Sequence, residues 1–275
     1  MILVGDAGGN KTDWRLQDGK NIVQFSQGGF NAVTHDLSSF VRQCEITFSD
    51  QKDNISQVFL YAAGITDQSK PVIEENLSEV FSTGQITVEN DLLGASRSLF
   101  EDKKGRIGIL GTGAGYCEYD GHQITKRIPS LGYIIGDEGS GSYLGKKLLR
   151  TYFRGELNKE LSSLFSRAYG SREDEILNAV YAAQGNTYLS SFSQFIIEHQ
   201  SKPEIYHLVY QAFQDYFDSF VKTNSEIRTP LRFTGSIAYF LGNILRKVGV
   251  DNGINIDLIS QSPIAGLALY HFENE

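Results

Sequence analysis

Two short glycine-rich stretches carry residues that could hold a phosphate group. Residues 5–13 read GDAGGNKTD, and residues 111–115 read GTGAG. Glycines let backbone N–H groups approach a phosphate, and Asp6 could hold Mg²⁺ through water. The first stretch is not a P-loop, because Asn10 stands where that motif has glycine and a strand is expected after it. A tight hairpin with Asp6 as turn former explains the first stretch equally well, and the second stretch alone is a weak signal.

Other segments carry carboxylates or small residues at places suited to a ligand. Asp91 ends an expected strand and opens an expected helix, where it could take the proton of a hydroxyl that attacks a γ-phosphate. Taken alone, an N-cap is the safer interpretation of Asp91. Asp137 and Glu138 lie in the glycine-rich loop 131–141 and suit a polyol, although they could merely complement a helix dipole. Residues 234–238 form a strand-to-helix turn suited to a base or ribose.

The two glycine-rich stretches are corners of two similar β-meanders. Strands are expected in two sets of three: 2–5, 12–17 and 22–26, then 106–110, 116–119 and 123–128. Each set has an Asp-Gly hairpin signal, at residues 18–19 and 120–121. The glycine turn precedes the hairpin glycine by 11 residues in one copy (8 to 19) and by 10 in the other (111 to 121). We therefore predict a duplicated architecture.

Strands that alternate with helices complete an α/β chain of two lobes. Further strands are expected at 58–62, 85–89, 231–233 and 254–259. Helices are expected between 58–62 and 85–89, and at 140–153, 173–183, 204–223, 237–248 and 264–272. We place the boundary near residues 103–105. This gives an N-terminal lobe 1–104, to which the terminal helix 264–275 returns, and a C-terminal lobe 105–263.

The composition narrows the class of protein. A chain of 275 residues with 40% hydrophobic residues suits two domains with buried cores. The net charge of −8 argues against nucleic acid as the main partner. Two cysteines, Cys44 and Cys117, cannot build a disulfide framework or a cysteine zinc cage, and the five histidines lack metal-ligand spacing. With no secretory signal and no membrane-length apolar run, we expect a cytoplasmic protein without a membrane partner.

Taken in order, these segments resemble the actin-like ATPase and sugar kinase superfamily. Within it they resemble the BadF/BadG/BcrA/BcrD ATPase family and its N-acetylglucosamine kinase members, over essentially the whole chain. Residues 6–12 look like the phosphate-1 motif, 111–113 the phosphate-2 motif and 235–238 the adenosine motif, and loop 131–141 is the most family-specific piece. The resemblance implies an α/β fold of two ribonuclease-H-like lobes that close on ATP and an acceptor in a central interlobe cleft.

The resemblance also implies an ATP-dependent kinase for a hexose or amino sugar, with N-acetylglucosamine as the best guess. Asp91 would be the catalytic base, and Mg²⁺ would bind at Asp6. Nucleotide contacts are expected from Gly8, Gly9, Asn10, Lys11, Thr12, Gly111, Thr112, Gly113, Gly235 and Ser236. Sugar contacts are expected from Asn31, Gly64, Asp91, Gly132, Asp137 and Glu138. A homodimer is a family-level expectation.

Two residues depart from the family's motifs, and two other functions stay open. Asn10 replaces a threonine, and Ala114 replaces a serine, so a hydroxyl that could touch the phosphates is missing and altered nucleotide contacts are expected. One alternative is an ATPase that activates a partner enzyme through an iron–sulfur cluster. The positions of Cys44 and Cys117, in an expected helix and strand, argue against it. The other is a sugar- or nucleotide-sensing protein without turnover.

Overall fold

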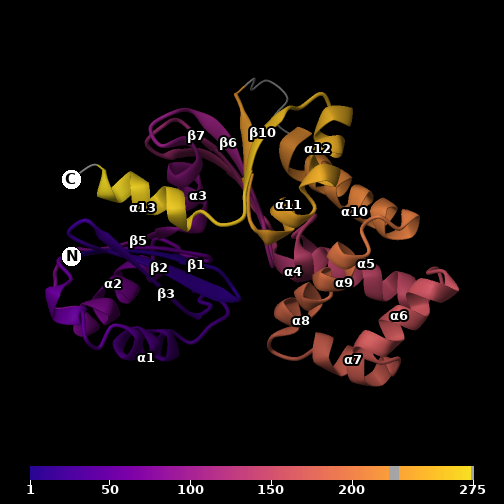
Figure 1. Ribbon diagram of the computed structural model, residues 1–275, viewed down its shortest axis with the longest axis horizontal. Helices are drawn as coiled ribbons and strands as arrows, with labels where there is room; N and C mark the ends of the chain where they lie inside the picture. Colours follow the sequence, from indigo (N-terminus) through magenta and orange to yellow (C-terminus); the bar gives the residue numbers. More distant parts are fainter. Residues whose placement is uncertain (223–228, 274–275) are drawn as a thin grey trace. The chain divides into compact units, whose positions relative to one another are not determined.

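Two five-stranded sheets with the same strand order organise the chain in the computed structural model, which describes residues 1–222 and 229–273 (Figure 1). The first sheet has the order β3-β2-β1-β4-β5. The second, read from its far edge, has the order β8-β7-β6-β9-β10, so each strand repeats one of the first sheet. The duplicated architecture and the α/β fold class predicted from the two meanders are confirmed.

The first sheet combines a meander with two parallel strands. Its strands are β1 (Ile2–Ala7), β2 (Lys11–Asp18), β3 (Asn21–Gly28), β4 (Gln57–Ala62) and β5 (Ile86–Asn90). β1, β2 and β3 pair antiparallel, whereas β4 pairs parallel with both β1 and β5. The helices of this part are α1 (Leu37–Thr47), η1 (Lys52–Asn54), α2 (Ser69–Val80), α3 (Asp91–Phe100) and α13 (Ile264–Phe272).

The β1–β2–β3 meander is fixed by its turn and by one aromatic side chain. Asp18 pairs with Asn21, so the hairpin loop has two residues, and Gly19 adopts a φ of +59° that suits glycine. Trp14 of β2 is fully buried among the rings of α1 and its flank. A Cβ on Gly5 would overlap the Trp14 ring, so the glycine lets β1 pack onto β2 immediately before Asp6.

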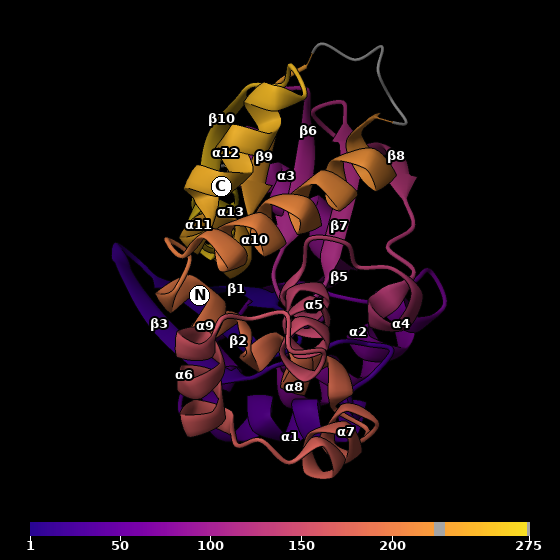
Figure 2. The ribbon, with the colours of Figure 1, turned by 90° about the vertical axis from the view of Figure 1, so that its right-hand side faces the viewer.

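The second sheet is accompanied by a larger set of helices. Its strands are β6 (Gly105–Leu110), β7 (Ala114–Tyr119), β8 (Ile124–Ile128), β9 (Leu231–Thr234) and β10 (Ile256–Ser260). The helices are α4 (Gly132–Ile135), α5 (Gly141–Phe153), α6 (Lys159–Tyr169), α7 (Glu173–Val180), α8 (Gly185–Ser191), α9 (Ser193–Glu198), α10 (Pro203–Tyr216), η2 (Phe217–Val221), α11 (Ser236–Phe240) and α12 (Gly242–Asp251) (Figure 2). Ser140 caps α5 as predicted, because its Oγ accepts the N–H of Tyr143 at 3.2 Å.

Three of the predicted helices are wrong in length or continuity. The helix expected at 204–223 is α10 followed by the π-helical turn η2, and residue 223 lies outside the described residues. The helix expected at 173–183 ends at Val180. The helix expected at 237–248 breaks at Leu241, which leaves helical geometry with a φ of −104° and a ψ of 19° and is fully buried. Gly242, which follows directly, is a poor helix former and favours a break in the otherwise continuous helical spacing.

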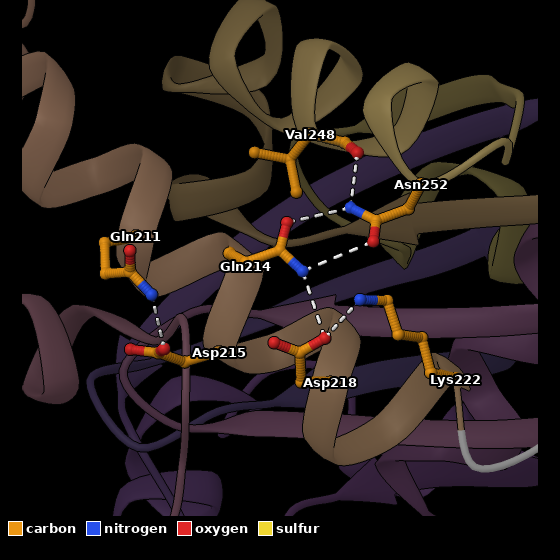
Figure 3. Close-up of polar contacts among 7 residues, drawn as sticks. All are labelled: Gln211, Gln214, Asp215, Asp218, Lys222, Val248 and Asn252. Atoms are coloured by element: carbon orange, nitrogen blue, oxygen red, sulfur yellow. Dashed lines mark hydrogen bonds and ion pairs between the residues drawn. The ribbon is translucent and has the colours of Figure 1, made fainter.

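A reciprocal amide pair joins α10 to α12 (Figure 3). Gln214 Nε2 donates to Asn252 Oδ1 at 3.3 Å, and Asn252 Nδ2 donates to Gln214 Oε1 at 2.9 Å. Asn252 Nδ2 also donates to the carbonyl oxygen of Val248 at 2.8 Å. The apolar faces of the same two helices enter one core, which includes Phe213 of α10 and Leu245 of α12.

The chain divides into two compact units. One comprises Met1–Ile107, Glu118–Thr125 and Ser262–Glu275, and the other comprises Gly108–Cys117 and Lys126–Gln261. In the first unit α13 packs on α3, where Ser98 Oγ donates to the carbonyl oxygen of Pro263 at 2.8 Å. No helix within the described ranges is both long and apolar enough to cross a membrane.

Candidate active site

The turn between β1 and β2 presents two successive backbone N–H groups. The N–H of Gly8 donates to the carbonyl oxygen of Lys11 at 2.9 Å, which closes the turn. Within residues 1–222 and 229–273, the N–H groups of Gly9 and Asn10 have no hydrogen-bond partner. Both residues are at least partly exposed. Successive N–H groups of this kind form a concavity that binds anions, so the turn is suited to phosphate.

The segment after β3 brings two predicted sugar-binding residues to this turn. A Cβ on Gly29 would overlap the carbonyl oxygens of Gly8 and Gly9, so the glycine lets the two segments touch. Asn31 follows and forms a parallel bridge with residue 63. Asn31 Oδ1 accepts the N–H of residue 33 at 2.9 Å. A Cβ placed on Gly64, whose φ is +76°, would lie 2.5 Å from the same oxygen. Asn31 and Gly64 are thus in contact, and the Asn31 amide nitrogen has no partner among the described residues.

Two of the predicted nucleotide-binding side chains have structural partners. Thr12 is fully buried, and its hydroxyl donates to the carbonyl oxygen of Gly28 at 3.0 Å. That contact ties β2 to β3, so the Thr12 hydroxyl is already occupied. Lys11 Nζ pairs with Asp13 at 2.7 Å and keeps 59% of its side chain exposed. The backbone of this turn therefore offers more to a phosphate than the Thr12 side chain does.

Three carboxylates gather at the same end of the first sheet. Asp6 is the penultimate residue of β1 and lies directly opposite Asp13 of β2 in the antiparallel register. Burial, and after it the neighbouring charges of Asp91 and Asp13, raise the pKa of Asp6 to about 7, against a hydrogen bond from Ser262 that lowers it. Three crowded carboxylates favour either a proton or a cation at Asp6.

Asp91 is the first residue of α3 and does not occupy the cap position. The N-cap is Asn90, whose Oδ1 accepts the N–H of Leu92 at 3.0 Å. Asp91 Oδ1 accepts the same N–H at 2.9 Å. The interpretation of Asp91 as the N-cap is therefore wrong by one residue. Asn90 Nδ2 also donates to the carbonyl oxygen of Ile65 at 3.4 Å, which holds the start of α3 beside the chain that follows Gly64.

The residues near Asp6 fit Mg²⁺ as a loosely coordinated ion. No group of three or more histidine, cysteine, aspartate or glutamate side chains in the described part of the chain is arranged to hold a metal. Mg²⁺ usually keeps several waters and needs only one or two carboxylates together with substrate phosphates. The crowding that raises the pKa of Asp6 is relieved by such a cation, so the donor set suits it.

The turn between β6 and β7 repeats the first turn in the other unit. The N–H of Gly111 donates to the carbonyl oxygen of Gly113 at 3.0 Å, and the N–H of Ala114 donates to Asp137 Oδ1 at 3.1 Å. The N–H groups of Thr112 and Gly113, between these two bonds, have no partner in the part of the chain that the structure describes. Each unit thus carries one turn with two successive unpaired N–H groups, at the same place in the duplicated sheet.

The predicted adenosine motif and the start of α5 lie against this second turn. A Cβ on Gly235, whose φ is +114°, would overlap the carbonyl oxygen of Leu110. The N–H of Gly141 donates to the carbonyl oxygen of Gly111 at 2.8 Å. The structure therefore brings Gly235 to the Gly111 turn, and Ser236 follows as an exposed residue.

The loop before α5 places its two carboxylates differently. Asp137 is only 7% exposed, and burial raises its pKa to about 6, against the Ala114 N–H and the charge of Lys146, which lower it. Glu138 is partly exposed. Gly132 is exposed with a φ of +71° and is the first residue of the short helix α4, which precedes both carboxylates in the chain. Of the three predicted sugar contacts in this loop, Asp137 alone touches the glycine turn.

Sequence reasoning missed two charged residues of these sites. Lys146 of α5 lies beside Asp137 and donates to the carbonyl oxygen of Tyr133. No signal in the sequence marked Lys146, because residues three or four apart share a helix face, whereas Lys146 lies six residues after the Ser140 cap. Asp13 was visible within the first motif, but its position opposite Asp6 depends on the strand register.

Comparisons with known proteins identify relatives of the same kind. No family model matches the chain. A curated N-acetylmuramic acid/N-acetylglucosamine kinase of Clostridium acetobutylicum is 27% identical over 155 residues, and the chain spans about half of that protein, 51%. An N-acetyl-D-glucosamine kinase of Dictyostelium discoideum is 23% identical over 94% of this chain and 89% of its own length.

A solved structure matches along the whole chain. It is a protein of Porphyromonas gingivalis, provisionally named an N-acetylglucosamine kinase, with 33% identity and a TM-score of 0.94 over 100% of this chain and 99% of its own. The resemblance to N-acetylglucosamine kinases, drawn from the glycine turns and from loop 131–141, is confirmed. Because this identity extends along the whole of that relative, the chain belongs to the N-acetylglucosamine kinase family.

Proposed function

We propose that this protein is an ATP-dependent sugar kinase, which transfers the γ-phosphoryl group of ATP to a hydroxyl of a hexose or amino sugar. N-acetylglucosamine is the first candidate acceptor, because that sugar stands in the names of the relatives. One observation carries the proposal beyond family membership. The turns at Gly9–Asn10 and Thr112–Gly113 occupy equivalent places in the two sheets, and each leaves two successive N–H groups for anionic oxygens.

In this proposal backbone N–H groups of these turns bind phosphate oxygens of ATP, and the small residues at Gly235 and Ser236 accommodate the adenosine. Phosphoryl transfer depends mostly on positioning and on charge stabilisation, so backbone donors fixed by the fold are well suited to it. Mg²⁺ bound with Asp6 would supply charge neutralisation on the phosphate oxygens. Asp13 adds negative charge beside Asp6 and strengthens the preference for a cation there.

Asp91 acts as the general base in this proposal. Its position at the start of α3 is held by the capped helix, and it is close enough to Asp6 for their charges to interact. There it takes the proton of the sugar hydroxyl as that oxygen attacks the γ-phosphorus. Asn31 donates through its unpaired amide to the sugar, and Glu138 accepts from a sugar hydroxyl. A cytoplasmic location belongs to the same proposal, because ATP is the phosphoryl donor.

The cysteines do not favour an ATPase that carries an iron–sulfur cluster. Cys44 and Cys117 form no disulfide among the described residues, and both are fully buried. Burial raises the pKa of the Cys44 thiol to about 12, so the thiolate that a cluster requires is disfavoured. Colourless purified protein without iron is the expected result.

ADP release in the presence of a sugar panel tests the proposal. The purified protein with ATP and Mg²⁺ should release ADP only when a suitable sugar is added, and mass spectrometry should find one equivalent of sugar phosphate per ADP. The panel should contain N-acetylglucosamine, N-acetylmuramic acid, glucose and N-acetylmannosamine. A folded protein that binds a sugar yet releases no ADP with any of them would reject the kinase in favour of a sensing role.

A further inference from the structure

Asp137 is bonded to the glycine turn of its own unit rather than to solvent. Its Oδ1 accepts the N–H of Ala114 at 3.1 Å, and the side chain is almost fully buried. A Cβ on Gly113 would lie 3.2 and 3.3 Å from the two carboxylate oxygens, so the carboxylate lies along the turn. Asp137 also adopts a φ of +58°, which is uncommon for a residue with a side chain.

The backbone of Asp137 joins two further segments. Its N–H donates to the carbonyl oxygen of Ser130 at 2.9 Å, and its carbonyl oxygen accepts the N–H of Ser140 at 3.1 Å. One residue therefore connects the start of the 130–138 loop, the cap of α5 and the glycine turn. An unfavourable φ persists where the surrounding structure fixes it from several sides, as these bonds do.

These bonds bear directly on the donors that are left for a ligand. The bond from Gly111 to Gly113 closes the turn on one side, and the bond from Ala114 to Asp137 closes it on the other. The unpaired N–H groups of Thr112 and Gly113 lie between them. A glycine-rich segment has little intrinsic preference for one backbone conformation. The bond from the Ala114 N–H to the Asp137 carboxylate therefore fixes the backbone conformation of the turn.

We propose that Asp137 is a positioning residue for the nucleotide: it holds the Ala114 peptide and so orients the Thr112 and Gly113 N–H groups for a phosphate. The proposal rests on the proposed function and extends it, because it makes the conformation of the glycine turn depend on the 130–138 loop. Lys146, which lies beside Asp137 and Glu138, offsets the negative charge that these carboxylates bring near a phosphate.

Nucleotide affinity measured without any sugar tests this role, because a sugar contact cannot contribute to it. Calorimetric titration with ADP and Mg²⁺ should give a dissociation constant about tenfold higher for Asp137→Gly, the expected cost of one lost charge-assisted hydrogen bond. Glycine accepts a φ of +58°, so this variant removes the carboxylate without backbone strain. Asp137→Asn keeps an oxygen that can accept the Ala114 N–H and should remain within about threefold of wild type.

Asn158→Ala is the matched control in the same unit. Asn158 Oδ1 accepts the N–H of Leu161 at 2.9 Å as the cap of α6, so this change also removes one side-chain bond to a backbone N–H. Its ADP affinity should equal that of wild type. Hydrogen exchange of the peptide that contains residues 111–115 should be faster in Asp137→Gly than in Asp137→Asn or Asn158→Ala.

Three outcomes separate this inference from the proposed function. If Asp137→Gly binds ADP within twofold of wild type while its KM for the sugar rises, Asp137 is a sugar contact only and the inference is overturned. If the wild type binds ADP but phosphorylates no sugar, the kinase proposal fails and the variants still decide the role of Asp137. If the folded wild type binds no ADP, both proposals are overturned.

Discussion

Asp6 lies directly opposite Asp13 across the antiparallel pair β1–β2, and the charge of Asp91 also acts on it. Like charges that face each other across a sheet are destabilising, and burial adds to the cost. Repulsion among these carboxylates therefore lowers the stability of the protein when no ligand is bound. It is explained by a ligand that brings positive charge, which is the role proposed for Mg²⁺ bound with ATP.

Asp6→Asn should therefore stabilise the free protein and reduce its activity. The folded pKa of Asp6 is raised from 3.8 to about 7, so the stability contributed by its protonated form is lost as the pH rises through 7. At pH 8, without Mg²⁺ or nucleotide, the amide should raise the free energy of unfolding by about 1–3 kcal/mol. Denaturant titration measures this change, and ADP release with sugar measures the loss of activity.

Asp67→Asn serves as the control for that variant. Asp67 is an exposed carboxylate of the same unit, and its change should alter neither stability nor turnover. An Asp6→Asn protein that is less stable than wild type by 1 kcal/mol or more would contradict the argument from charge crowding. It would indicate that the hydrogen bond from Ser262 outweighs the repulsion.

The stability of the first unit should also depend on pH through His271. Arg97 Nη1 donates to Tyr61 Oη at 2.7 Å, which leaves the Tyr61 proton for His271 Nε2 at 2.8 Å. Burial first, and then the charge of Arg97, lower the pKa of His271 to about 4. An unfolded histidine binds a proton near pH 6.5, so this residue disfavours the folded state increasingly as the pH falls from about 6.5 to 4.

Comparison with His271→Gln isolates that contribution, because raised carboxylate pKa values act in the opposite direction over the same range. The advantage of wild type over the variant in the free energy of unfolding should shrink by about 1–2 kcal/mol between pH 7 and pH 4.5, less than full burial would give. Urea titrations at both pH values measure this difference. A difference that does not change with pH would show that His271 titrates normally when folded.

Gly235 should tolerate alanine much less than Gly253 does. Both have a positive φ, of +114° and +71°, but a Cβ on Gly235 would overlap the carbonyl oxygen of Leu110, whereas nothing lies within 4 Å of a Cβ on Gly253. Gly253→Ala should cost about 1 kcal/mol from backbone strain alone, and Gly235→Ala about 2–4 kcal/mol. Thermal unfolding followed calorimetrically ranks the two variants, and equal costs would contradict the packing of Gly235 against β6.

The features predictable from the sequence are those set by local chemistry. The hairpins at Asp18 and Asp120 form where the Asp-Gly signals stand, because the glycine that follows takes a positive φ in each. Ser140 caps α5 because a serine hydroxyl satisfies the first free N–H groups of a helix. The duplicated architecture followed from the repeat of these local signals.

The features that could not be predicted depend on contacts between distant parts of the chain. Asn90 rather than Asp91 caps α3, although the two residues are chemically similar caps. The bond from Ala114 to Asp137 joins residues 23 apart and required the backbone path of the intervening loop. The break at Leu241 interrupts a regular helical pattern, and spacing along one helix does not reveal it.

The most direct test of the account is single-turnover phosphoryl transfer by Asp91→Asn with saturating ATP, Mg²⁺ and N-acetylglucosamine. An asparagine oxygen can still accept the N–H of Leu92, so the start of α3 is preserved. The account predicts a rate of sugar phosphate formation at least about 100-fold below wild type, with ADP affinity unchanged. A variant that forms sugar phosphate at the wild-type rate would contradict the assignment of Asp91 as the base.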